Sequence, residues 1–207
     1  MAQRTDEWFE MRRGKITASR ISDVMATGRG GKPSVTRENY LIELALQRVT
    51  GVVAGDGFVN AAMQRGTELE PIARAEYEVH TGFDVEEVDF VPHPTYPNTG
   101  ASPDGLVESE GMVEIKCPQP KQHLSTLRTL DVDREYMLQM QWQMECAGRQ
   151  WCDFVSYNPE FPERLRLIVV RVLRNAALIG QITQAVMEAE AEIRALVAEI
   201  ETMQGGA

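Results

Sequence analysis

Apolar residues follow two spacings along the chain, and together they predict helices alternating with short strands. Helical spacing covers 17–25, 36–50, 60–80, 134–148 and 176–203. Short apolar, β-branched runs predict strands at 83–91, 105–107, 112–117, 151–157 and 165–173. Pro71 disfavours an unbroken helix over 60–80, and a start near Glu68 would place it in the first turn. The order predicts an α/β fold with a mixed central β-sheet flanked by α-helices, as a single domain over 1–207.

A predicted hairpin brings three charged residues together in the middle of the chain. Ser102–Leu106 has turn residues, and the strand that follows it contains Glu114 and Lys116. Because side chains alternate along a strand, Glu114 and Lys116 share one face, and the other face carries Val113, Ile115 and Cys117. With Asp104, these side chains suit a hard divalent cation and a lysine that positions a water or offsets phosphate charge. A solvent-exposed hairpin explains this fragment equally well, so other segments of the chain must decide between a metal site and an exposed turn.

Charge is distributed unevenly along the sequence. The chain has 207 residues, of which 43% are hydrophobic, so it is long enough for a sizeable core, and its net charge is -10. Residues 1–50 contain 9 basic and 6 acidic residues, whereas 51–111 contain 2 and 12. The total argues against a protein that coats DNA with a basic surface. Part of the acidic excess in the middle segment fits a metal site that is neutralised when loaded.

The N-terminal segment and the cysteines favour a cytoplasmic protein. No apolar run reaches the length of a membrane span. The N-terminal segment has charges at Arg4, Asp6 and Glu7, where a signal peptide would need an apolar stretch. The three cysteines show no C-x-x-C spacing, which favours a reducing compartment and argues against a disulfide framework or a zinc site. We expect a protein without membrane contact.

Two further helices offer polar side chains to the hairpin. Glu68 and Glu70 point to different sides of a helix, so we expect only one of them to reach Asp104 and Glu114. In the helix 134–148, Gln139 and Gln143 share a face and are able to reach a polar site, although a solvated face is an alternative.

Five motifs in one order resemble the phage lambda exonuclease family, also called the YqaJ-like viral recombinase domain, within the PD-(D/E)xK nuclease superfamily. They are Trp8-x-x-x-Arg12-x-Gly14-x-Ile16-Thr-Ala-Ser19, Gly66-x-x-x-Glu70, Ser102-Pro-Asp-Gly-Leu106, Glu114-x-Lys116-Cys-Pro118 and Tyr136-Met-x-Gln139-x-Gln141. The resemblance implies a PD-(D/E)xK nuclease-like fold.

It also implies a magnesium-dependent 5′-to-3′ exonuclease that digests one strand of linear duplex DNA and leaves a 3′ overhang for recombination by strand annealing. By position, Asp104, Glu114 and the carbonyl of Ile115 would be metal ligands, and Glu70 would serve a second metal. Two Mg²⁺ ions, replaceable by Mn²⁺, would share the site. Catalysis would also use two further residues, Lys116 to assist the attacking water and Gln139 to hold the water or the lysine.

The resemblance further implies how DNA is held. Three residues would bind the 5′-terminal phosphate, because a guanidinium and hydroxyls suit that group: Arg12, Ser19 and Ser102. Met63 falls where the family has an apolar wedge that opens the duplex, with ordinary core packing as the alternative. Arg29 and Lys32, in a Gly-rich loop, would contact the DNA backbone. Family members form homotrimeric rings and act with a single-strand annealing recombinase in the bacterial host cell, so we expect the same here.

Other functions remain open. A restriction-type endonuclease would share the Asp, Glu and Lys chemistry. A repair nuclease with an iron–sulfur cluster needs four cysteine ligands, and three cysteines are present. A DNA-end-binding recombination scaffold that lost its chemistry, or a metal-binding domain that ignores DNA, would also fit parts of the pattern.

Overall fold

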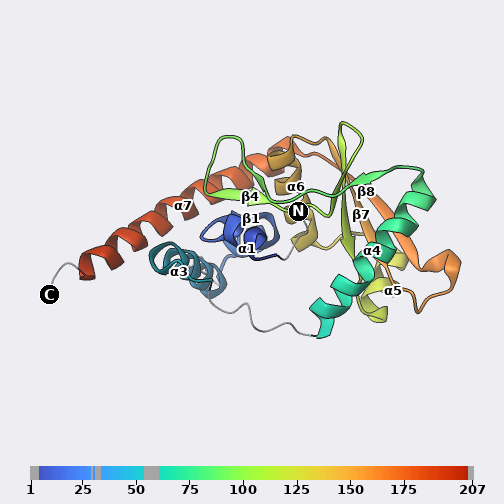
Figure 1. The fold of residues 1–207 in the computed structure, drawn as a ribbon, viewed down its shortest axis with the longest axis horizontal. Coiled ribbons are helices and arrows are strands. Elements are labelled where there is room, and N and C mark those ends of the chain that lie inside the picture. Colours follow the sequence, from blue (N-terminus) through green and yellow to red (C-terminus); the bar gives the residue numbers. More distant parts are fainter. Residues whose placement is uncertain (1–4, 29, 31–33, 54–60, 205–207) are drawn as a thin grey trace.

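The computed structural model describes residues 5–28, 30, 34–53 and 61–204, with the side chains of 61–63 and 204 excepted. The helices are α1 (Asp6–Arg12), η1 (Ala18–Arg20), α2 (Ile21–Val24), α3 (Val35–Thr50), α4 (Ala61–Thr81), α5 (Pro120–Thr129), α6 (Arg134–Ala147), η3 (Glu163–Leu165) and α7 (Ala176–Gln204). The strands are β1 (Ile16–Thr17), β2 (Val85–Glu86), β3 (Val91–Pro92), β4 (Thr99–Ala101), β5 (Gly105–Val107), β6 (Gly111–Lys116), β7 (Trp151–Tyr157) and β8 (Leu167–Leu173). Helices α3 and α7 lie at one end of the molecule, and α4 and α5 lie at the other (Figure 1).

The main sheet has five strands in the order β2-β5-β6-β7-β8. Strands β6 and β7 are parallel, and the other neighbouring pairs are antiparallel. One face of β6 packs with α4 through a cluster that includes Val113, Ile115 and Tyr77. The opposite face packs with α6 through a cluster that includes Met112 and Met140. The predicted mixed sheet flanked by helices is confirmed, and the solvated-hairpin alternative is wrong because both faces of β6 are covered.

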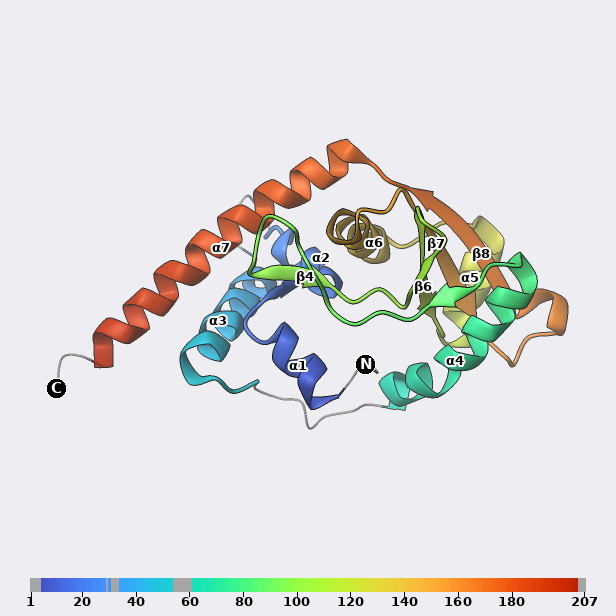
Figure 2. The same cartoon turned by 45° about the horizontal axis from the view of Figure 1, so that its top comes forward.

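A second, small sheet has the order β1-β4-β3 and supports the N-terminal region. Its core cluster contains Ile16 and Ala101 together with Trp142 of α6 and Leu44 of α3. Figure 2 shows α6 nearly end-on, between β4 on one side and β6 and β7 on the other. Helix α6 therefore belongs to both parts of the core, which explains why its residues 138–144 are all buried.

Helices α3 and α7 pack side by side and are joined by ion pairs. Arg37 contacts Glu192 with Nη–Oε distances of 2.8 and 2.9 Å. Arg48 contacts Glu190 with distances of 3.0 and 2.7 Å. Although α7 is long, none of the helices within the described ranges combines the length and apolarity that a bilayer crossing requires.

Some predicted boundaries were wrong. The segment 83–91 forms two short strands in different sheets, β2 and β3, rather than one strand. The predicted helix at 17–25 begins as the 3₁₀ turn η1 before α2. Helix α4 runs through Pro71, so the start near Glu68 is wrong. Pro71 is exposed, while Ala73 and Tyr77 anchor the same helix in the core. Elements α1, α5, β1 and β4 were not predicted, and the extent of the domain over 1–207 stays a prediction.

Candidate active site

Asp104 and Glu114 lie together where the hairpin begins. Gly105 pairs with Val113 in the antiparallel register, which sets Asp104 opposite the middle of β6. The amide of Ile115 donates to Asp104 Oδ2 at 2.6 Å. Glu114 is 1% exposed, on the face of β6 that α6 covers. The pair is therefore held by backbone geometry on one side and by a helix on the other.

Three side chains donate to the Glu114 carboxylate. Lys116 Nζ and Gln139 Nε2 contact Oε1 at 2.5 and 2.6 Å. Gln143 Nε2 contacts Oε2 at 2.7 Å. Gln139 and Gln143 are one helical turn apart on α6, so the i, i+4 spacing in the sequence signals both of them. A carboxylate offers about four lone-pair positions, so three donors leave room for about one cation.

The electrostatics favour a bound cation at this place. Burial raises the pKa of Asp104 well above its usual range, and the negative charges of Glu114 and Glu70 add to that effect. The charge of Lys116 and the amide of Ile115 oppose the rise without cancelling it. Burial alone would lower the pKa of Lys116, but Glu114 and Asp104 together raise it. Lys116 is therefore an ammonium at neutral pH, and two close carboxylates share this one positive neighbour.

Glu70 approaches the pair from α4 but is engaged by another partner. Its Oε1 lies 3.0 Å from Nη2 of Arg74, whose Nη1 lies 2.5 Å from Glu87. Within the described ranges, no three His, Cys, Asp or Glu side chains already form a group that could hold a metal ion. The donors brought together are thus Asp104 and Glu114, with the Ile115 backbone beside them. In this arrangement, Oε1 of Glu70 is engaged by Arg74.

The three predicted phosphate-binding residues form one cluster. Arg12 Nη1 donates to Ser102 Oγ at 3.0 Å, and Nη2 donates to Ser19 Oγ at 3.4 Å. Trp8 was not predicted as a site residue, yet its Nε1 donates to Ser102 Oγ at 3.1 Å. Its ring also lies 4.1 Å from the Arg12 guanidinium carbon. The i, i+4 spacing of Trp8 and Arg12 on α1 is the sequence signal for this stacking.

The surroundings of this cluster suit an anion. A cavity of about 310 Å³ opens beside it, and Arg12, Ser19, Lys15 and Arg20 are among its lining residues. Ser102 Oγ accepts two hydrogen bonds, from Arg12 and Trp8, so its own hydrogen is directed elsewhere and can reach a ligand oxygen.

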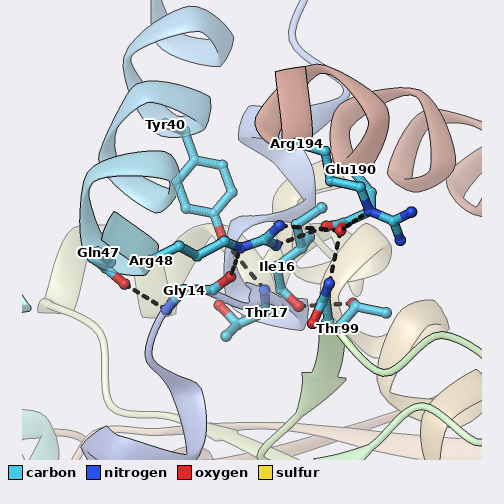
Figure 3. Close-up of polar contacts among 10 residues, drawn as sticks. Gly14, Ile16, Thr17, Tyr40, Gln47, Arg48, Thr99, Glu190 and Arg194 are labelled. Atoms are coloured by element: carbon cyan, nitrogen blue, oxygen red, sulfur yellow. Dashed lines mark hydrogen bonds and ion pairs between the residues drawn. The ribbon is translucent and has the colours of Figure 1, made fainter. Parts of the chain in front are cut away.

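Side chains from α3 and α7 fix the turn between Arg12 and Ser19 (Figure 3). Gly14 has a positive φ of 67°, its amide donates to Gln47 Oε1 at 2.8 Å, and its carbonyl accepts from Arg48 Nε at 2.7 Å. A Cβ at Gly14 would lie 2.7 Å from Arg48 Cγ, so both conformation and space require glycine. Arg48 is in turn held by Glu190 of α7.

The strand after this turn is pinned in the same way. Tyr40 Oη accepts from the Thr17 amide at 3.3 Å, and Thr99 Oγ1 donates to the Ile16 carbonyl at 2.7 Å, as Figure 3 shows. Trp142 of α6 donates from Nε1 to Thr99 Oγ1 at 3.0 Å. The phosphate-type cluster and the carboxylate pair are therefore both braced by α6.

Three predicted DNA contacts cannot be placed. Arg29 and Lys32 lie outside the described residues. Met63 lies within α4, but its side chain is outside the described part of the structure.

The model of the YqaJ-like viral recombinase domain matches residues 7–150, a range that contains the carboxylate pair and the Arg12, Ser19 and Ser102 cluster. The chain belongs to this family. The matched range contains the hairpin and the N-terminal turn and ends just after α6.

Solved structures agree with this membership. The chain is 46% identical to an alkaline exonuclease, LHK-Exo from Laribacter hongkongensis, with 97% of this chain and 98% of that chain covered and a TM-score of 0.89. A complex of LHK-Exo with dAMP gives the same identity and coverage, with a TM-score of 0.90. A phage-related exonuclease from Haemophilus somnus 129PT is 18% identical over 90% of this chain and 96% of that chain, with a TM-score of 0.71, and shares the fold. No curated protein matches the chain significantly. Together these findings support an exonuclease of the YqaJ family.

Proposed function

We propose that the chain is a magnesium-dependent exonuclease that digests one strand of linear double-stranded DNA from its 5′ end and leaves a 3′ overhang for phage-type recombination by strand annealing. One observation carries the proposal. The anion-type cluster at Ser102 and the carboxylate pair at Asp104 and Glu114 are joined by a link of a single residue, Pro103. A site that binds a terminal phosphate beside a metal-type carboxylate pair is suited to cutting at the phosphorylated end of a strand.

The oxygen donors fit Mg²⁺, which prefers carboxylate and carbonyl ligands. Asp104, Glu114 and the Ile115 carbonyl would hold one ion, and Glu70 would contribute to a second. When bound, such ions supply an activated water and neutralise charge on the scissile phosphate. Mn²⁺ accepts the same ligand types and would substitute.

The protein's own residues hold and orient the reacting groups. Lys116 remains an ammonium, since its carboxylate neighbours raise its pKa, so it donates hydrogen bonds to a water or a phosphate oxygen. Gln139 fixes one Glu114 oxygen. Arg12, with Ser19 and Ser102, would bind the terminal phosphate, and the stacked Trp8 ring restricts the orientation of the guanidinium. The 46% identical LHK-Exo forms a complex with dAMP, a nucleoside monophosphate of the kind that the proposed reaction would release.

The proposal includes an assembly and partners. A homotrimeric ring with a basic lumen would reconcile a net charge of -10 with a DNA substrate. Met63 would act as the wedge at the duplex end, and Arg29 and Lys32 would contact the DNA backbone. The 3′ strand would pass to a single-strand annealing recombinase in the cytoplasm of the bacterial host.

Digestion of an end-labelled linear duplex tests polarity, substrate and metal need together. With Mg²⁺, a 5′ label should be released at once as a mononucleotide, while a 3′ label should stay on a long strand. Chelation of the metal should stop the reaction. Lys116→Ala should abolish digestion but retain binding to duplex ends, which a gel-shift assay in EDTA measures.

Three results would contradict the proposal. Rapid cutting of covalently closed circular duplex would indicate an endonuclease. Immediate release of the 3′ label would reverse the polarity. Equal inactivity of the wild type and Lys116→Ala, with end binding retained, would indicate a non-catalytic scaffold.

A further inference from the structure

Gln143 lies between the two halves of the site. Its side chain is fully buried on α6, at 0% exposure. Nε2 donates to Glu114 Oε2 at 2.7 Å and makes a longer contact, 3.5 Å, with the backbone carbonyl of Ser102. The same serine presents its Oγ to Arg12 and Trp8. One amide group thus contacts both the carboxylate pair and the segment that would bind the phosphate.

The chemistry of the neighbours determines how this amide is oriented. A carboxylate and a carbonyl only accept hydrogen bonds, so the NH₂ end must face both of them. The opposite end, Oε1, is buried and has no hydrogen-bond partner among the described residues. A buried polar atom without a partner is unfavourable, so packing alone does not account for glutamine at this position. Its two donated contacts do.

We propose that Gln143 is a positioning residue that ties the 5′-phosphate pocket to the carboxylate pair, an inference that rests on the proposed exonuclease function. Through Ser102 it fixes the backbone that carries Oγ toward Arg12. Through Glu114 it fixes the oxygen that Lys116 and Gln139 do not contact. A terminal phosphate seated in the pocket and the reacting groups are then held in one frame.

The neighbouring glutamines provide matched comparisons. Gln139 donates to Glu114 but makes no hydrogen bond to Ser102 in the described part of the chain. Gln141, 1% exposed, donates to the Leu173 carbonyl at 2.9 Å and accepts from the Asn175 amide at 2.8 Å, at the junction of β8 and α7. The three glutamines therefore have three different roles: Gln143 contacts both halves of the site, Gln139 contacts one half, and Gln141 makes a buried structural contact.

Methionine is close to glutamine in length and cannot donate, so each glutamine is replaced by methionine. Two quantities are measured. The first is kcat with saturating Mg²⁺ and DNA. The second is the affinity ratio, which is the affinity in EDTA for a duplex with a 5′-phosphate divided by the affinity for the same duplex with a 5′-hydroxyl. Gln143→Met should lower kcat about 10- to 100-fold, as expected when a residue orienting a metal ligand is lost. It should also lower the affinity ratio about 3- to 10-fold, the equivalent of one hydrogen bond.

Gln139→Met should lower kcat and leave the ratio unchanged, whereas Gln141→Met should lower the melting temperature and change neither quantity. If Gln143→Met does not fold, Gln143→Leu serves instead, with leucine at the two comparison positions. A folded Gln143 variant that keeps the wild-type ratio would overturn the bridge and leave the exonuclease proposal intact. A wild type that degrades DNA without preferring a 5′-phosphate would overturn the pocket, and the bridge with it.

Discussion

Replacement of Arg12 by alanine should remove most of the preference for a 5′-phosphorylated end. In the structure the guanidinium is held by two serine hydroxyls and by the Trp8 ring, 4.1 Å away. A planar guanidinium fixed in this way can make a bidentate contact with a phosphate.

The size of the effect follows from these contacts. Hydrogen bonds to charged groups are worth about 1.5–3 kcal/mol each, and Arg12 is only partly buried, so about 3 kcal/mol is expected for the two together. This corresponds to about a 100-fold loss in the ratio of kcat/KM for phosphorylated over hydroxyl ends. Arg12→Lys should recover little of the loss, because an ammonium cannot form the planar fork.

The assay compares initial rates on two duplexes that differ only in the terminal group. Arg13→Ala is the matched control, because it removes the same charge one residue along the chain. Arg13 is bonded to Glu10 and to the Gly51 carbonyl, both at 3.0 Å. Arg13→Ala should lower the rates on the phosphorylated and the hydroxyl duplex by the same factor. An Arg12→Ala enzyme with the wild-type phosphate preference would refute the assignment, as would an equal loss of preference in Arg13→Ala.

Three further predictions concern metal binding, pH and packing. Mg²⁺ at about 100 times its Kd should raise the unfolding free energy by about 2.7 kcal/mol and the Tm by roughly 5–10 °C. Without metal, Asp104→Asn should have a higher Tm than the wild type, and Mg²⁺ should no longer raise its Tm. A Tm increase with Mg²⁺ in this variant, measured by calorimetry, would contradict the assignment of Asp104 as a ligand. Burial tends to raise the pKa of Glu190, but hydrogen bonds from Arg48, Asn98 and Arg194 lower it overall. The contribution of the ionised Glu190 to folding stability is therefore complete above the unfolded pKa of about 4.5 and is lost as pH falls through the lower folded pKa. Glu190→Gln should thus cost about 2 kcal/mol at pH 7 and progressively less below pH 4.5, and a cost independent of pH in denaturant titrations would disprove this. Gly100→Ala should destabilise by about 1–3 kcal/mol, because its Cβ would lie 2.6 Å from the Val91 carbonyl oxygen; an unchanged Tm would show that β3 and β4 separate easily.

The parts of the fold that were predictable are those whose pattern is set by local burial. Strand β7 and helix α6 have long apolar periodicity and were predicted almost to the residue. Strands β1, β3 and β4 have two or three residues each, too few for a period to be visible. Their pairing depends on contacts between distant segments, such as Ile16 with Thr99.

The candidate site divides in a similar way. Asp104, Glu114 and Lys116 are close in sequence: strand alternation places Glu114 and Lys116 on one face, and the predicted hairpin brings Asp104 to them. Helical spacing indicated a shared face for Gln139 and Gln143, but only the packing of α6 on β6 shows that this face meets Glu114. The ion pair of Glu70 with Arg74 depends on side-chain geometry within α4 and was not foreseen.

The link from Ser102 to Asp104 has a consequence for the length of the product. Two residues span at most about 7 Å, and the buried Pro103 between them further restricts the backbone. If the terminal phosphate is held at Ser102 and the bond is cut at Asp104, the phosphate that is cut is the next one along the strand. Each cycle would then release one mononucleotide and expose a new 5′-phosphate, so that every product end is again a substrate end.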